Sequence, residues 1–218
     1  MMVHDPIMLR PMVKVLLCVA LCSCVGPPRG RMPAPRISPQ SQVNQSQCFA
    51  ELKRLPVRYT LVPDQSAAPG CTLSSTLQLT NVGIPISNIR AIQCSLARAL
   101  SLWVQGALQP AAREILGSAV VRIESMGAYA CRNIIGGSGS GLSQHATGNA
   151  VDVGAFILAD GRRISIRDGW NGADDARAFL RSIRASACKR FVTVLSPEYN
   201  AAHFDHLHFD MGGKPFCR

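Results

Sequence analysis

Two short segments in the second half of the chain hold most of the residues that could do chemistry. The first contains His145 and Asp152. The second holds three of the chain's five histidines within six positions, namely His203, His206 and His208. In an extended strand alternate side chains share a face, so His206 and His208 are expected to point the same way. Imidazoles and a carboxylate are ligands that Zn²⁺ takes in sites with three protein ligands and one position open to water. The two segments together therefore predict a zinc site.

The spacing of these residues resembles that of a known group of zinc peptidases. The pattern S-x-H-x-x-G-x-A-x-D over residues 143–152, followed by H-x-H at 206–208, resembles the metal motif of the D-alanyl-D-alanine carboxypeptidases and murein endopeptidases. These enzymes share a core with lysostaphin-type and Hedgehog-type domains. A longer segment, roughly 48–218, resembles the bacterial extensin-like C-terminal domain family. The chain lacks the long Ser-Pro repeats of plant extensins, so that family name by itself indicates no function.

The resemblance implies a role for each residue of the two motifs. His145, Asp152 and His208 are implied as the zinc ligands. His206 would lie beside the metal and either stabilise the transition state or orient water. Arg132 matches an upstream arginine that can hold a substrate carboxylate through two hydrogen bonds.

The resemblance leaves the general base open between two residues. Asp205 lies three residues before the last ligand, where the carboxypeptidase branch has an acid. His203 lies five residues before that ligand, where the penicillin-insensitive endopeptidase branch has a histidine. We favour Asp205, although a regular strand would turn it away from His206, so a bend or bulge would be needed.

The implied activity is zinc-dependent hydrolysis of amide bonds in the peptides of the bacterial cell wall. Zinc polarises a scissile carbonyl and lowers the pKa of water to about 7, and a basic protein would attract peptidoglycan stem peptides, which are rich in carboxylates. The alternative is a non-catalytic metal-binding module that recognises envelope polymer. A third hypothesis is a purely structural protein whose histidines bind nothing. Nucleic acid is disfavoured as a partner because basic and aromatic residues are not interleaved.

The first 24 residues have the pattern of an export signal. Arg10 and Lys14 precede the apolar run 15–21, which is too short to span a bilayer, and small residues follow it. Residues 21–24 also resemble a bacterial lipobox, in which Cys24 would be lipidated and attach the protein to a membrane; simple cleavage nearby is the alternative. Both lead to the periplasm or envelope. Residues 25–45 are rich in Pro, Ser and Gln and are expected to form an unstructured linker.

Six further cysteines are expected to form three disulfides in that oxidising compartment. They are Cys48, Cys71, Cys94, Cys131, Cys188 and Cys217. Many connectivities are open to six cysteines, and the sequence does not choose among them. These cysteines include no C-x-x-C pair, which disfavours a zinc cluster held by cysteines.

The elements that must position these residues indicate one α+β domain from 46 to 218. Of the 218 residues, 47% are apolar and 17% charged, which excludes disorder over most of the chain, and the net charge is +10. Apolar periodicity predicts helices at 95–105, 109–117 and 174–188. Strands are predicted at 119–123, 149–156, 163–166, 191–195 and 206–211, and a mobile glycine-rich loop at 136–141. We therefore expect an antiparallel sheet with flanking helices, in a monomer of the Hedgehog and D-Ala-D-Ala-peptidase type.

Overall fold

The structure, a computed structural model, describes residues 1–2, 39–135 and 141–218. Most of the expected leader, including Cys24, lies outside the described residues, as do the linker up to residue 38 and the glycine-rich loop at 136–140. The first helix, α1 (Pro39–Leu52), begins inside the segment 25–45 that composition assigns to a linker. A disulfide between Cys48 and Cys94 joins α1 to the next helix, and the polar composition of the segment does not reveal this support. Within the described ranges no helix is both long and apolar enough to cross a bilayer.

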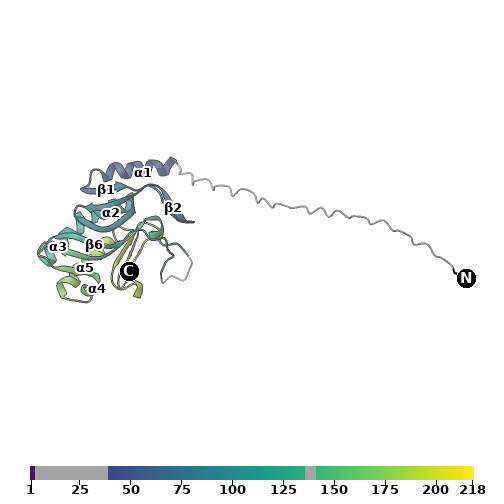
Figure 1. Cartoon of the computed structure of the whole chain (residues 1–218). Coiled ribbons are helices and arrows are strands. Elements are labelled where there is room, and N and C mark those ends of the chain that lie inside the picture. Colours follow the sequence, from purple (N-terminus) through teal and green to yellow (C-terminus); the bar gives the residue numbers. More distant parts are fainter. Residues whose placement is uncertain (3–38, 136–140) are drawn as a thin grey trace. The chain divides into compact units, whose positions relative to one another are not determined.

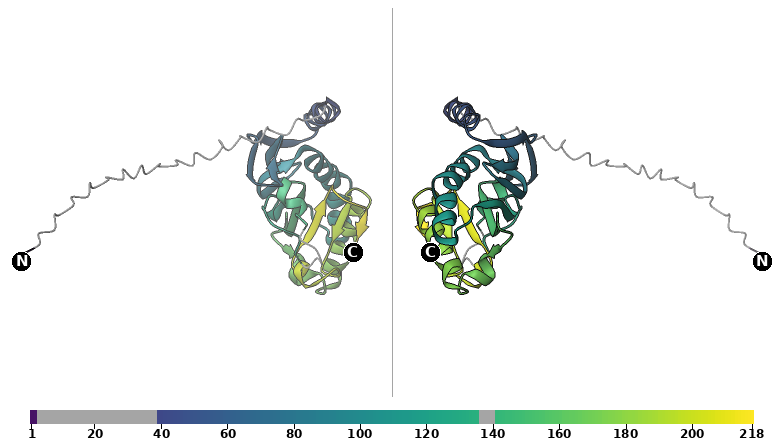
Figure 2. Two further views of the ribbon diagram at one scale, coloured as in Figure 1. Left: turned by 90° about the vertical axis from the view of Figure 1, so that its right-hand side faces the viewer. Right: turned by 90° about the vertical axis from the view of Figure 1, so that its left-hand side faces the viewer.

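A nine-stranded sheet forms the frame of the domain. Along the sheet its strands follow the order β1 (Val57–Leu61), β4 (Thr76–Val82), β5 (Pro85–Gln93), β6 (Val120–Gly127), β7 (Ala150–Leu158), β10 (Leu207–Asp210), β9 (Thr193–Leu195) and β11 (Phe216–Cys217). The ninth strand, β8 (Arg163–Ser165), pairs with β7, and β2 (Gln65–Ala68) and β3 (Cys71–Leu73) form a separate hairpin. Figure 2 shows the yellow C-terminal strands beside the green strands of the sheet.

The α+β class is confirmed, but the expectation of an antiparallel sheet is wrong, because the sheet is mixed. Strands β5 and β6 pair in parallel, and so do β9 and β11. The chain passes from β5 to β6 through a helical crossover, which returns it in the same direction, whereas a tight hairpin would reverse it. Between β9 and β11 the chain reverses twice, once into β10 and once after it, so the last strand runs parallel to β9.

Helices flank the sheet, as the sequence predicts. The crossover consists of α2 (Cys94–Trp103), a π-helical turn η1 (Val104–Leu108) and α3 (Gln109–Leu116). The wide turn comes directly before Pro110, which has no N–H and whose ring would clash with the carbonyl of residue 106 in a regular α-helix. The remaining helices are α4 (Ile166–Gly169) and α5 (Asp174–Ala187), together with short 3₁₀ turns η2 (Gln144–Thr147) and η3 (Ala201–His203). Figure 1 shows α1 beside α2, and α3 beside α5.

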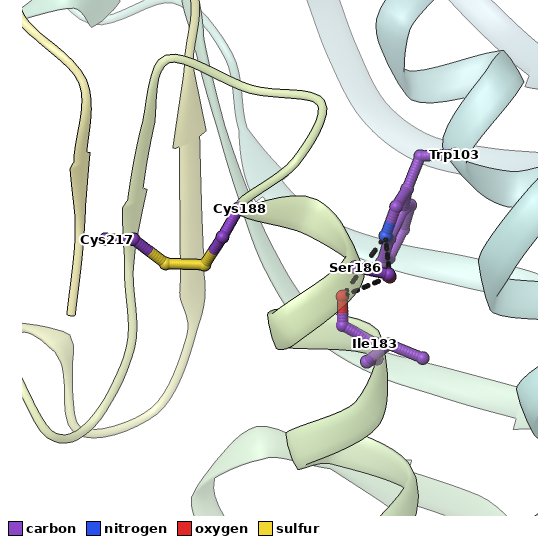
Figure 3. Close-up of a disulfide and its surroundings, with 5 residues drawn as sticks. All are labelled: Trp103, Ile183, Ser186, Cys188 and Cys217. Atoms are coloured by element: carbon purple, nitrogen blue, oxygen red, sulfur yellow. Dashed lines mark hydrogen bonds between the residues drawn. A yellow bond between two sulfur atoms is a disulfide. The ribbon is translucent and has the colours of Figure 1, made fainter.

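Trp103, at the end of α2, connects the helices to the centre of the sheet. Its ring meets Phe209 of β10 edge-on, with 5.2 Å between ring centroids, and lies 6.4 Å from the ring of Phe156 on β7. Its Nε1–H donates to the carbonyl oxygen of Ile183 at 3.2 Å and to Oγ of Ser186 at 3.1 Å, both on α5 (Figure 3). Strands β7 and β10, which carry two of the expected zinc ligands, are therefore fixed by the same buried ring.

All six cysteines between residues 48 and 217 form disulfides, which confirms the expected three pairs and supplies their connectivity. The pairs are Cys48–Cys94, Cys71–Cys131 and Cys188–Cys217. The second joins β3 to the segment that carries Arg132. The third joins the end of α5 to the C-terminal strand β11 (Figure 3).

Candidate functional site

Asp152 and His208 occupy neighbouring strands and meet on one face of the sheet. Strands β7 and β10 are antiparallel, and their register pairs Asp152 directly with His208. Side chains of directly opposed residues lie on the same face of a sheet. Oδ1 of Asp152 accordingly lies 2.9 Å from Nδ1 of His208.

His145 reaches the same point from the 3₁₀ turn that precedes β7. Its Nε2 lies 3.1 Å from Oδ2 of Asp152 and 3.2 Å from Nδ1 of His208. One ligand atom from each of the three side chains falls within 4.8 Å of the other two. The structure thus brings together the three residues implied as metal ligands, although 63 positions separate His145 from His208 in the sequence.

Two neighbouring residues shape the turn that presents His145. Oγ of Ser143 caps the turn by accepting the backbone N–H of His145 at 3.3 Å. Gly148 ends it with a φ of +67°, in the left-handed region that favours glycine. A Cβ at Gly148 would also lie 3.2 Å from the carbonyl oxygen of Ala91. The S-x-H-x-x-G part of the motif therefore encodes the turn that aims the imidazole.

Both histidines of the cluster are held so that one ring nitrogen faces inward. Nδ1–H of His145 donates to the carbonyl oxygen of Ala128 at 2.9 Å, because a carbonyl can only accept. The Nε2–H of His208 donates to Oδ2 of Asp210 at 3.0 Å. The atoms left for a ligand are Nε2 of His145 and Nδ1 of His208. Outer hydrogen bonds of this kind orient histidines in metal sites, so this donor set fits a divalent cation such as zinc.

The pKa values of Asp152 and His208 are both shifted, because these two buried groups interact with each other and with their neighbours. Burial acts to raise the pKa of Asp152, but hydrogen bonds from His145 and His208, together with their charges, hold it well below its ordinary range. Burial acts to lower the pKa of His208, but the hydrogen bonds and charges of Asp152 and Asp210 outweigh burial and raise it to about 9. Without a metal the cluster therefore retains a proton on His208, in the place that a cation would fill.

His206 lies beside this cluster and is oriented by Asp205. Nδ1–H of His206 donates to Oδ1 of Asp205 at 2.9 Å, and its Nε2 lies 3.7 Å from Oδ1 of Asp152. Residues 204 and 205 form a turn, and β10 begins only at Leu207. This is the bend that contact between Asp205 and His206 requires. Asp205 lines a cavity beside Glu124 and other polar residues, whereas His206 lines a separate cavity.

His203 also lies beside the cluster, and it lines the same cavity as His206 and His208. Its Nδ1–H donates to Oδ1 of Asn200 at 2.7 Å, so the lone pair of the neutral ring resides on Nε2. Its ring centroid is 5.0 Å from that of His206 and 6.0 Å from that of His208. Burial, together with the charges of His206 and His208, lowers the pKa of His203 to about 4. The ring is therefore neutral at pH 7 and able to accept a proton.

A cavity of about 290 Å³ opens beside the cluster. His203, His206 and His208 line it, and so does Arg132. Nη2 of Arg132 lies 4.0 Å from Oδ2 of Asp152, so the guanidinium is an ion-pair neighbour of the cluster as well as part of the cavity wall. The cavity gives a small ligand access to His208 and to the neighbouring side chains of His203 and His206.

Sequence reasoning missed several residues that support the site. Asp210 ends β10 and accepts a hydrogen bond from the outer nitrogen of His208. The H-x-D spacing of these two residues could have indicated this contact, because alternate residues of a strand share a face. The Ala128 carbonyl has no sequence signal, since every residue carries one. The contact of Asn200 with His203 likewise depends on the local turn η3.

Comparison with known proteins identifies one family. The family model described as extensin-like protein C-terminus matches residues 46–218, a range that includes every residue of the cluster and of the cavity wall. No curated protein and no solved structure matches the chain.

Proposed function

The chain belongs to the extensin-like protein C-terminus family, and we propose that it is a zinc-dependent hydrolase of amide bonds in peptidoglycan stem peptides. The observation that carries this proposal is the convergence of ligand atoms from His145, Asp152 and His208 beside an open cavity. Two neutral imidazoles and a carboxylate are a ligand set that leaves one position of a tetrahedral zinc ion for water or substrate. On the same motif we assign the fold to the D-Ala-D-Ala-peptidase and Hedgehog type.

Each residue around the cluster has its own role in the proposed reaction. Zinc, when bound, would supply Lewis acidity for the scissile carbonyl and for the attacking water. His203 would accept the proton from water at Nε2 and pass it to the leaving amine, because it is neutral at pH 7 and faces the cavity. His206 would stabilise the developing oxyanion from Nε2. We assign Asp205 to positioning of His206, which reverses the preference drawn from the sequence, because Asp205 accepts a hydrogen bond from His206 and lines another cavity.

Arg132 would bind a carboxylate of the substrate. Its guanidinium lines the cavity and lies within ion-pair distance of Asp152, so it adds positive charge where a ligand enters. A planar guanidinium can hold a carboxylate through two parallel hydrogen bonds. The rival role is a structural ion pair with Asp152, and substrate dependence separates the two roles.

The leader pattern supports export of this enzyme to the periplasm or envelope. The charged and apolar segments of residues 10–24 are typical of a signal peptide, and Cys24 would carry a lipid that attaches the chain to a membrane. Three disulfides in one domain agree with an oxidising compartment. We propose that the protein acts there as a monomer on peptidoglycan.

The proposal is tested with the full exported chain, purified and loaded with zinc. Metal analysis should give one zinc per chain, and the His145→Ala variant should lose it. Incubation with purified muropeptides should then produce pairs of fragments whose masses add up to the mass of the intact peptide plus one water. His203→Gln should keep the zinc and lose the cleavage. Stoichiometric zinc with every stem peptide and cross-bridge intact would contradict the hydrolase.

Two observations favour a second function, a metal-binding module that recognises wall polymer without cleaving it. Asp205, the acid three residues before the last ligand, does not line the cavity, and the pKa of His203, about 4, makes it a weak base. In this case muropeptides would bind to the zinc-loaded chain and remain intact, and His145→Ala would abolish the binding.

A further inference from the structure

Exposed apolar side chains surround the cavity beside the cluster of His145, Asp152 and His208. Among the described residues, eleven large hydrophobic side chains are exposed. Five of them line this cavity and are between 40% and 54% exposed, namely Ile134, Ile135, Leu142, Tyr199 and Phe216. Single exposed apolar residues need no explanation, but a contiguous group around a concave site indicates a binding surface.

The five side chains come from two parts of the chain. Ile134, Ile135 and Leu142 form an aliphatic group, and a β-bridge between Asn133 and Leu142 joins the two segments that carry them. Tyr199 and Phe216 form an aromatic pair, with ring centroids 5.5 Å apart in an edge-to-face arrangement.

The aromatic pair is in direct contact with His203. The ring of Tyr199 also meets that of His203 edge-on at 5.3 Å. Apolar surface therefore extends up to the residue that we propose as the proton acceptor. A side chain bound on this surface would belong to a residue adjoining the scissile bond.

The positive charge of Arg132 in the same cavity indicates that a ligand with such an apolar side chain also carries a carboxylate. Arg132 lines the cavity, and Nη2 is 4.0 Å from a carboxylate oxygen of the metal cluster. One extended residue spans about 3.3–3.6 Å, so a substrate carboxylate bound by Arg132 would lie within about one residue of the scissile amide. A ligand that suits both features is a peptide end with a free carboxylate and an apolar side chain.

We propose that this cavity is a specificity subsite for a peptide substrate with a side chain larger than methyl next to the scissile amide and a free carboxylate within one residue of it. Tyr199, Phe216 and Leu142 contact that side chain, and Arg132 binds the carboxylate. The inference rests on the proposed function for the position of the scissile bond. It goes beyond that function because it excludes peptides with only alanine at this position as the preferred ligands.

The test measures binding, so that it does not depend on catalysis. N-acetyl dipeptides X-Ala, with X as Ala, Leu or Phe and a free carboxylate, are titrated calorimetrically into the zinc-loaded full chain, in both the L,L and D,D series. In at least one series the Leu and Phe peptides should bind about 10-fold to 100-fold more tightly than the Ala peptide. The C-terminal amide of the best peptide should lose at least about tenfold in affinity. Equal affinity for the three peptides, or no binding at all, would overturn the inference.

Matched variants locate the preference in the cavity. Leu142→Ala and Phe216→Ala should reduce the preference to within about threefold of the Ala peptide. Leu61→Ala removes an equally large exposed side chain on β1, outside the cavity, and should leave the preference unchanged. Tyr199→Ala replaces Phe216→Ala if the latter fails to fold, as judged by zinc content and near-UV circular dichroism. A preference that survives Leu142→Ala and the aromatic variant refutes the subsite.

The outcomes separate this inference from the proposed function. Cleavage of muropeptides without a preference for larger side chains would refute the subsite and leave the hydrolase intact. A preference that depends on Leu142 and Phe216, without cleavage of any muropeptide, would support the subsite and refute the hydrolase.

Discussion

Asp152 and His208 are directly opposed on strands β7 and β10, and Oδ1 of Asp152 lies 2.9 Å from Nδ1 of His208. Strand pairing thus creates the contact between two of the three proposed ligands, and the rigidity of the sheet maintains it. Trp103, at the end of the crossover helix α2, packs on both strands through Phe156 and Phe209. The cluster therefore depends on the central sheet, while the cavity beside it depends on the segments around Arg132 and on the C-terminal strand.

Zinc affinity should increase with pH. In the metal-free protein the pKa of His208 is about 9, so below pH 9 the ring carries a proton on the nitrogen that zinc needs. Zinc must displace this one proton, and the apparent affinity should rise about tenfold per pH unit up to about pH 9 and then level off. Asp152 stays ionised over this range and adds no slope, because its pKa lies well below its ordinary value. Competition with a chromophoric chelator between pH 6 and 9.5 measures the slope; a flat profile would contradict it.

Asp210→Asn should weaken zinc binding about 10-fold to 100-fold. Oδ2 of Asp210 accepts the outer N–H of His208, which fixes the ring and makes its inner nitrogen more basic. The measurement is made at pH 9.5, where competition from the proton on His208 is small. Asp160→Asn serves as the control, because Asp160 is an exposed acid that pairs with Arg162. If both variants bind zinc like the parent chain, the outer hydrogen bond does not support the site.

His203→Gln should lower kcat for muropeptide cleavage about 10²-fold to 10⁴-fold, the usual contribution of a general base, with zinc content unchanged. Asp205→Asn should have a smaller effect, about 10-fold to 100-fold, because Asp205 acts through the orientation of His206. Both are measured at saturating substrate. The opposite ranking would return the role of general base to Asp205.

Removing the Cys188–Cys217 disulfide should impair peptide binding while sparing zinc binding. Cys217 lies beside Phe216 on the last strand, and the disulfide ties that strand to the end of α5 (Figure 3). The double variant Cys188→Ser, Cys217→Ser should bind the apolar dipeptide about tenfold more weakly, because Phe216 loses its fixed place in the cavity wall. The double variant Cys48→Ser, Cys94→Ser is the control, since these residues are outside the cavity. Each variant is assayed at a temperature where circular dichroism shows it folded. Equal binding by the two variants would show that the last strand keeps its place without the disulfide.

Gly148→Ala should destabilise the domain more than Gly117→Ala. Both glycines have a φ of +67°, which costs an alanine about 1–2 kcal/mol. At Gly117 a Cβ would meet open space, but at Gly148 it would lie 3.2 Å from the carbonyl oxygen of Ala91. Urea unfolding of the metal-free variants compares their free energies of unfolding. A difference of about 1 kcal/mol or more is expected from the added crowding, and equal values would show that the backbone near Ala91 yields.

Local patterns identified the elements whose signal is contained in a short segment. The helix predicted at 174–188 is observed as α5 at Asp174–Ala187, because its apolar residues repeat with helical period and lie on the buried face. The strand predicted at 149–156 is observed as β7 at Ala150–Leu158. The sequence does not predict strands β1 to β5, since much of their stability comes from pairing with each other, either in the nine-stranded sheet or in the separate β2–β3 hairpin.

The amino-acid sequence alone establishes the types and spacing of the metal-site residues, because S-x-H-x-x-G encodes a local turn and H-x-H a local strand. It also determined that six cysteines would pair, but not which with which. Three relationships depend on the folded chain: β7 and β10 are neighbours in register, Asp205 and His203 line different cavities, and Phe216 meets Tyr199 in the cavity that Arg132 lines. The physical reason is that these relationships are contacts between segments far apart in the chain, and strand order and disulfide connectivity fix them rather than local conformational preference.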